Sequence, residues 1–154
     1  MVDTYIRLLF GHLIGDYVLQ NNWMALNKKD KKMISPILTH CLVYTVCVAV
    51  WLLPELLKTS WIVSGMFVCG IFWSHYIFDR FPIVEAWMTF FKGRNYKDTF
   101  DHLVRVSSDD KMPSKLDTVK VMFNASYTAL VLTVADNTAH LICMYYLVKY
   151  YLVR

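Results

Sequence analysis

The chain has 154 residues, of which 56% are hydrophobic and 18% are charged, and its formal net charge is +4. Soluble domains have about 45–50% apolar and about 25% charged residues, so this composition argues against an ordinary soluble domain. The length suits one domain, residues 1–154. Because the basic residues lie between apolar segments, they fit membrane topology, and we expect no nucleic acid partner.

A helix that crosses a membrane needs about 20 mainly apolar residues. Taken in chain order, the segments predicted to do so are 4–26, 34–57, 60–83 and 116–153. The first is the least hydrophobic, because it contains Arg7, His12, Asp16 and Gln20, but the rest of its surface is apolar. The sequence therefore predicts an all-α fold, an integral membrane bundle of four transmembrane helices.

The polar connections predict how this bundle is oriented. Four lysines between residues 28 and 32 separate the first two predicted helices, and seven basic residues from Arg80 to Lys115 lie near the end of the third or between the third and fourth. Cytoplasmic loops are enriched in Lys and Arg, so we expect both basic loops in the cytoplasm and both termini outside. Residues 84–106 mix aromatic and basic side chains, which predicts an amphipathic helix in the membrane interface.

Histidine and aspartate recur at one spacing inside the predicted helices. The pairs are His12 with Asp16, His75 with Asp79, and Asp136 with His140, while His40 stands alone on the second helix. Residues four apart share one face of a helix. Ionisable side chains inside a membrane are costly and by default mark a functional site. We therefore expect these seven side chains to face one another inside the bundle.

The seven residues are compatible with two chemistries and one structural role. Imidazole and carboxylate groups together suit a divalent transition metal, zinc first, with iron or manganese as alternatives. Seven candidate ligands exceed one tetrahedral shell, so either two ions bind or some aspartates orient the histidines. The same groups could instead relay protons or cations, or form a polar network that only fixes helix packing. We favour the metal site.

The N-terminal segment GHLIGDYVLQ contains His12, Gly15, Asp16 and Gln20 as an H-x-x-G-D-x-x-x-Q motif, and Trp-x-Ala-x-x-Lys follows it. Together with LTHCLVYT, SHYIFD and ADNTAH, it resembles a domain-of-unknown-function family of small bacterial and phage membrane proteins. Asn137 departs from that pattern, which has glutamine there. The resemblance implies the polar site and a bacterial inner (cytoplasmic) membrane, but no reaction. A looser similarity to inner-membrane metal-dependent hydrolases is an analogy only.

The sequence thus predicts a membrane-embedded metal-dependent hydrolase that acts on a lipid or lipid-linked substrate at the cytoplasmic leaflet. The predicted ligands of one or two ions are His12, Asp16, His40, His75, Asp79, Asp136 and His140. Asp16, Asp79 and Asp136 are also the predicted catalytic carboxylates, because one of them could act as general base. The rivals are a divalent-cation or proton transporter using the same residues, and a non-enzymatic membrane factor held together by a metal. The oligomeric state stays open.

Overall fold

The computed structural model describes residues 2–30, 32–93, 98–99, 101, 104–105 and 115–152. Within these ranges every regular element is a helix, which confirms the all-α prediction. The chain divides into two compact units: a first unit of Met1–Phe81 with Ala139–Arg154, and a second unit of Pro82–Thr138. Six of the seven predicted site residues fall in the first unit, and Asp136 falls in the second.

The segment predicted as one helix over 4–26 forms three shorter elements. Helix α1 covers Val2–Leu13, a π-helical turn, η1, covers Ile14–Val18, and α2 covers Asn22–Asn27. The break before α2 comes from Asn21, whose extended backbone leaves the helix and whose side chain accepts a hydrogen bond from the Met24 amide at 2.9 Å. Asparagine is among the best N-cap residues, and this cap interrupts an otherwise continuous apolar pattern.

The second and third predicted spans are helical, with one interruption. Helix α3 covers Ser35–Trp51, α4 covers Leu53–Leu56, and α5 covers Trp61–Arg80. The helix predicted over 34–57 breaks at Leu52, where φ is −97° and ψ is 10°. Pro54 accounts for the break, because it lacks the amide hydrogen that would continue the helical ladder and its ring clashes with the preceding turn.

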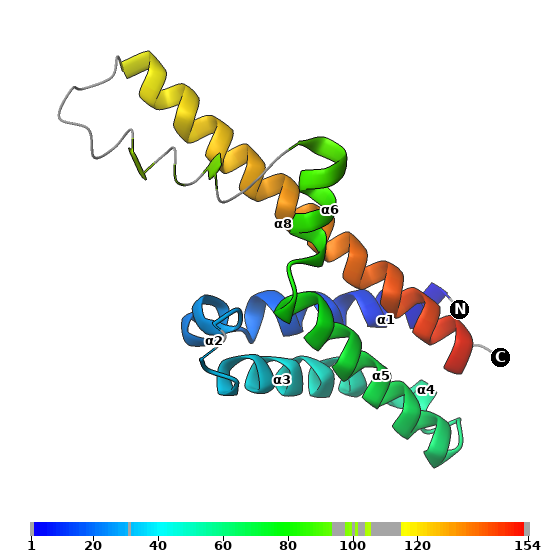
Figure 1. Cartoon of the computed structure of the whole chain (residues 1–154). Helices are drawn as coiled ribbons and strands as arrows, with labels where there is room; N and C mark the ends of the chain where they lie inside the picture. The colour runs from blue at the N-terminus through cyan, green and yellow to red at the C-terminus, as the bar shows by residue number, and fades with distance from the viewer. Residues whose placement is uncertain are drawn as a thin grey trace. The chain divides into compact units, whose positions relative to one another are not determined.

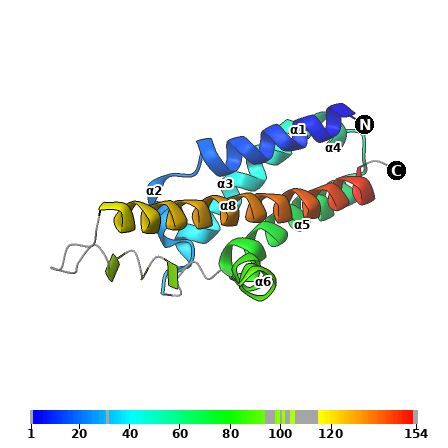
Figure 2. The same ribbon diagram turned by 90° about the horizontal axis from the view of Figure 1, so that it is seen from above.

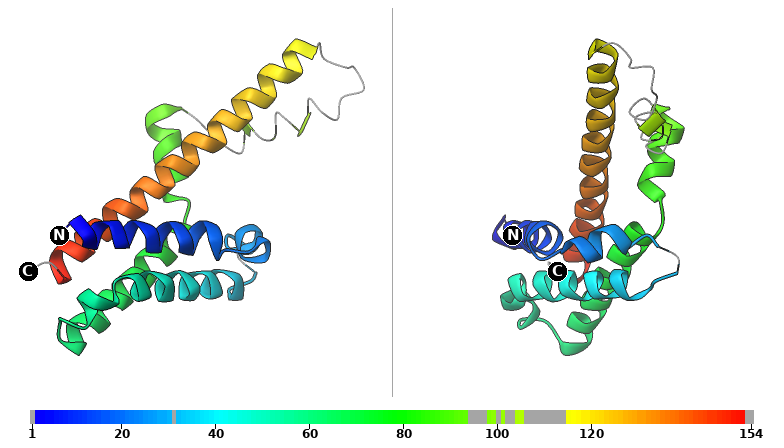
Figure 3. Two further views of the ribbon diagram at one scale, coloured as in Figure 1. Left: turned by 180° about the vertical axis from the view of Figure 1, so that it is seen from behind. Right: turned by 90° about the vertical axis from the view of Figure 1, so that its left-hand side faces the viewer.

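Helix α3 packs between α1 and α5 and runs antiparallel to both, as Figures 1 and 3 show. Seen from above, α3 passes beneath α1 (Figure 2). Two glycines allow the close approach. A Cβ atom on Gly11 would lie 3.0 Å from Val48 Cα, and one on Gly15 would lie 2.9 Å from Tyr44 Cδ2. Small residues at a helix interface permit such contacts, which larger ones would block.

The end of α8, a long helix covering Lys115–Tyr151, completes the first unit. Tyr145 on this helix stacks on Tyr5 of α1, with ring centroids 5.1 Å apart. Together the helices bury an apolar core, defined here by Leu8, Tyr44, Val48, Leu52, Leu56, Phe67, Ile71, Met144 and Val148. This apolar core lies next to the polar site residues along the same helices.

In the second unit, α6 covers Ile83–Lys92 and ends at Gly93, whose φ of 58° is favourable only for glycine. Helix α6 falls within the interfacial segment predicted over 84–106, of which residues 94–97, 100, 102–103 and 106 lie outside the described residues. Trp87, Phe90 and Phe91 are exposed on α6. Its position in a membrane interface stays a prediction.

Among the described helices, two are long and apolar enough to cross a membrane: α5, and Thr118–Tyr151 within α8. Helix α3 is apolar but has 17 residues, and α1 has 12. The structure thus gives two candidate spans where the sequence predicted four. The N-cap at Asn21 and the proline break near Leu52 shorten the other two.

Candidate metal centre

Five helical elements contribute side chains to one polar site in the first unit. The contributors are His12 on α1, Asp16 in η1, His40 on α3, His75 and Asp79 on α5, and His140 on α8. The four histidines are buried, with exposed fractions of 3% or less. Six of the seven side chains that we expected to face one another therefore lie close together in the first unit. We call Asp16, His40, His75, Asp79 and His140 the His/Asp cluster.

At the centre of the cluster two imidazoles face each other. The Nε2 atoms of His40 and His75 lie 2.9 Å apart. Two nitrogen lone pairs repel at this separation, so the contact requires a proton or a cation between them. Tyr44 holds one of the rings in place by stacking on His75, with centroids 3.6 Å apart and 8° between the planes. The two imidazoles are thus fixed as a pair.

Two carboxylates, Asp16 in η1 and Asp79 on α5, lie next to this pair of imidazoles. Asp16 Oδ1 lies 3.3 Å from the Nε2 atoms of both His40 and His75. Asp79 Oδ2 lies 3.0 Å from His40 Nε2 and 3.4 Å from His75 Nε2. Ligand atoms bound tetrahedrally to zinc at about 2.0–2.1 Å are about 3.3 Å from one another. These donor–donor distances of 2.9–3.4 Å therefore suit a bound metal ion.

The donor atoms form two overlapping triads, in each of which the potential ligand atoms lie within 4.8 Å of one another. One triad is Asp16, His40 and His75, and the other is His75, Asp79 and His140. Both contain His75, so they make one continuous cluster. Three protein ligands with a fourth position left open is the usual arrangement of catalytic zinc sites. Geometrically, the cluster could hold a metal ion.

His12 lies beside the triads and contacts two residues that support them. Its Nδ1 atom is 2.9 Å from the Tyr44 hydroxyl and 3.5 Å from Asp16 Oδ2. The Tyr44 hydroxyl lies within hydrogen-bond distance of both His12 Nδ1 and the Met144 sulfur, which is 2.7 Å away. Nδ1 thus orients Asp16 and Tyr44, and the role of His12 as a ligand stays a prediction.

Asp136 is half-buried on α8 in the second unit, four residues before His140 on the same helix. Its roles as ligand and catalytic carboxylate stay predictions. Gln20 follows η1 and is half-buried, and its side-chain Nε2 has no hydrogen-bond partner among the described residues. Neither residue belongs to the two triads.

Lys28 is a site residue that the sequence pattern did not reveal. Its Nζ atom lies 2.9 Å from Asp79 Oδ2, the oxygen that also faces His40 and His75. The lysine run at 28–32 predicted only topology. The signal for Lys28 was nevertheless present, because it is the lysine of the Trp-x-Ala-x-x-Lys element that follows the N-terminal motif.

Arg80 fixes the backbone that carries Lys28. Its Nη1 atom donates to the carbonyl of Lys28 at 3.1 Å and to the carbonyl of Asp30 at 2.8 Å. The end of α5 is thereby tied to the turn after α2. In the sequence, Arg80 is one of the basic residues that predicted only membrane topology. The structure shows instead that it anchors the segment that brings Lys28 to the cluster.

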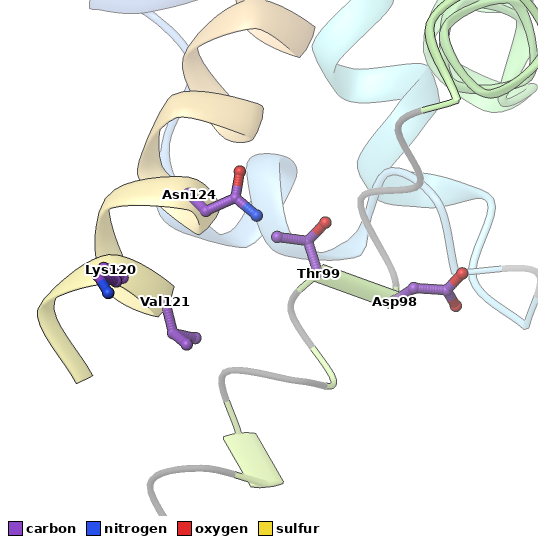
Figure 4. Close-up of a pocket in the computed structure, with 5 residues that line it drawn as sticks. All are labelled: Asp98, Thr99, Lys120, Val121 and Asn124. Carbon is purple, nitrogen blue, oxygen red and sulfur yellow. The ribbon is translucent and has the colours of Figure 1, made fainter. Parts of the chain in front are cut away.

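A separate pocket lies in the second unit, between the start of α8 and residues 98–99 (Figure 4). Its lining consists of Asp98, Thr99, Lys120, Val121 and Asn124. It contains no histidine or cysteine and only one carboxylate, so its lining does not offer the donor set of a transition-metal site. The His/Asp cluster is the stronger candidate site.

Comparison with known proteins identifies a family but no activity. Over residues 4–104, well over half of the chain, the sequence matches a family described as protein of unknown function (DUF3307). The matched region contains Asp16, Lys28, His40, His75 and Asp79, and it ends before α8. No curated protein and no solved structure matches the chain. The chain therefore belongs to this family of unknown function.

Proposed function

We propose that this protein is a membrane-embedded metal-dependent hydrolase that acts on a lipid or lipid-linked substrate. One observation carries the proposal: the Nε2 atoms of His40 and His75 face each other at 2.9 Å between the carboxylates of Asp16 and Asp79. Buried carboxylates and imidazoles at metal-ligand spacing are costly to retain unless a cation compensates them. We infer zinc as the first candidate, because tetrahedral coordination by nitrogen and oxygen suits it.

The apolar surface supports a membrane setting for the site. Helix α5 has 20 residues, which corresponds to about 30 Å, the thickness of the hydrocarbon core of a bilayer. The apolar window of α5 has a mean hydropathy of 1.4, yet only 17% of it is buried within the protein. A core helix of a soluble protein would bury most of such a window. Most of α5 is therefore available to contact lipid.

The membrane arrangement follows from the same features. We propose a multi-pass protein of the bacterial inner membrane, with the basic loops in the cytoplasm and both termini outside. Lys28 and Arg80 then lie near the cytoplasmic leaflet, at the end of α5 that carries His75 and Asp79. A lipid headgroup could reach the cluster there while its acyl chains stay in the bilayer.

The cluster residues divide between holding the metal and moving a proton. His40 and His75 supply two nitrogen ligands, and Asp79 lies beside them with an exposed fraction of 3%. The bound metal would lower the pKa of a coordinated water to about 7 and polarise the scissile bond. Asp16 is more accessible, with a side chain 15% exposed, and it is oriented by His12. We therefore propose Asp16 as the carboxylate that accepts a proton from the attacking water.

The experiment that tests this proposal is metal analysis of protein purified in detergent, followed by turnover assays on the metal-loaded form. Wild type should carry near-stoichiometric zinc, iron or manganese, and His75→Ala and Asp79→Asn should lose it. Asp98→Asn is the matched carboxylate control and should keep the metal, because Asp98 is exposed and belongs to neither triad.

Turnover separates the hydrolase from its rivals. Loaded wild type should hydrolyse a member of a panel of lipid phosphates and lipid esters, and Asp16→Asn should be slower by at least about 100-fold, as general-base removal predicts. Metal-loaded protein that hydrolyses none of the panel, but carries zinc across proteoliposomes, would contradict the hydrolase and favour the transporter. Wild type without metal would contradict the metal centre itself.

A further inference from the structure

We infer that the substrate group entering the cluster is a phosphate, held jointly by the metal and by Lys28. This inference rests on the proposed metal centre and goes beyond it by naming the substrate class. The geometry that supports it is the contact of the Lys28 ammonium with Asp79 Oδ2 at 2.9 Å, next to the two facing imidazoles.

The charges around the cluster leave an excess positive charge once a metal binds. Asp16 and Asp79 contribute two negative charges, and a divalent ion would balance both while the histidines are neutral ligands. Lys28, which contacts the almost fully buried Asp79, then brings the net charge of the site to +1. An uncompensated charge in such surroundings is costly. The filled site therefore favours an anionic ligand over a neutral ester or amide.

Lys28 also links the buried cluster to the surface. Its side chain is 20% exposed, whereas that of Asp79 is 3% exposed. An anion that arrives from the cytoplasmic side would therefore meet the ammonium before it meets the deeper carboxylate. Lysine is a common phosphate ligand, and a metal ion paired with a cationic side chain is a recurring way to bind phosphoryl oxygens.

The position of Lys28 is built into the fold. Lys28 follows α2, whose start is fixed by the Asn21 cap, and Arg80 holds the carbonyls of Lys28 and Asp30. The ammonium is thus placed from two directions, by the end of α2 and by the end of α5. A lysine that served only as a topology signal would not need this support. Lys29, its exposed neighbour, provides a matched control.

The test measures binding of inorganic phosphate to zinc-loaded protein by calorimetry, in a maltoside detergent and after free zinc is removed. Lys28→Gln should keep its zinc and bind phosphate at least about tenfold more weakly than wild type, because a charge-assisted hydrogen bond is lost. Lys28→Arg should retain most of the affinity, and Lys29→Gln should match wild type. Zinc-free wild type should bind phosphate much more weakly than the loaded protein.

A second arm identifies the source of the phosphate. Phosphatidic acid in nanodiscs should compete with inorganic phosphate if a lipid headgroup is the ligand. Phosphate binding without such competition would indicate a water-soluble phosphate ester, within the same substrate class. Equal losses in Lys28→Gln and Lys29→Gln, or no phosphate binding to zinc-loaded wild type, would overturn the inference. Metal analysis before phosphate is added distinguishes this failure from failure of the metal centre.

Discussion

Two buried regions of the first unit follow each other on the same helices, and they differ in chemistry. One helical turn separates their members, as in Tyr44 and His40 on α3, Ile71 and His75 on α5, and Met144 and His140 on α8. The apolar core is made of aliphatic, aromatic and methionine side chains, and its polar contacts come from the Tyr44 hydroxyl. The His/Asp cluster instead brings together ionisable groups whose burial is unfavourable by itself.

From this difference we infer that the apolar core stabilises the fold and that the His/Asp cluster binds the metal. Substitutions in the apolar core remove packing and should lower stability whether or not a metal is present. Substitutions in the cluster remove ligands, and they should lower metal affinity while costing the metal-free protein little. Removing one member of a buried polar network costs little only where the groups that contacted it keep other partners.

The largest expected effect on stability is that of Phe67→Ala in the apolar core. Phe67 is fully buried on α5, and its truncation should destabilise the bundle by about 3–5 kcal/mol through lost packing and a cavity. Thermal or denaturant unfolding in detergent measures this loss. Zinc content, measured at a temperature where the variant is folded, should stay close to that of wild type.

His75→Leu is the counterpart, two turns further along α5 in the cluster. It should lose the metal, yet the stability of its metal-free form should stay within about 1 kcal/mol of metal-free wild type. The reason is that both carboxylates keep other partners: His12 and His40 for Asp16, and Lys28 and His40 for Asp79. If metal-free His75→Leu unfolds as readily as Phe67→Ala, the cluster is part of the structural core and the distinction between the two regions fails.

Gly15→Ala should lower both the stability of the protein and its metal affinity, with a smaller loss of stability than Phe67→Ala. Its new Cβ atom would lie 2.9 Å from Tyr44 Cδ2, and the Tyr44 ring is fully buried against His75. Overpacking of this kind costs about 1–3 kcal/mol, and displacement of the ring should also weaken metal binding. Gly65→Ala is the control, because nothing lies within 4 Å of its new Cβ. Equal unfolding midpoints for the two variants would contradict the close packing of η1 on α3.

Tyr44→Phe should have a small effect on stability. It removes the hydroxyl that contacts His12 Nδ1 and the Met144 sulfur, and it keeps the ring that stacks on His75. We expect a loss of about 1 kcal/mol in stability. Metal affinity should fall by about 10-fold, because residues that orient the ligands tune the metal. An unchanged zinc dissociation constant would show that the His12 and Tyr44 contacts do not support the centre.

The sequence predicted the cluster better than it predicted the helices that carry it. A spacing of four residues places His75 and Asp79 on one face of a helix, and the cost of burying them inside apolar segments points to a shared interior. Hydropathy did not predict the breaks at Asn21 and Leu52, because each depends on local backbone chemistry: a side-chain cap and a nearby proline.

The spacing of residues along the sequence could not predict the contact of Lys28 with Asp79. The two residues are 51 positions apart, and they meet only because α2 turns back toward the end of α5, where Arg80 holds it. The spacing also could not predict that His12 lies outside the two triads, because His12 and Asp16 show the same spacing as His75 and Asp79. Identical spacing in sequence thus leads to different contacts in the fold.

We have proposed that imidazole nitrogen and carboxylate oxygen bind one metal inside the first unit. X-ray absorption at the metal edge, on protein purified with its native metal, identifies the ligand atoms. The spectrum should fit nitrogen and oxygen ligands at about 2.0–2.2 Å with the multiple scattering of at least two imidazoles, and this signal should be absent from His75→Leu. A spectrum dominated by sulfur at about 2.3 Å, or protein purified without metal, would contradict the claim.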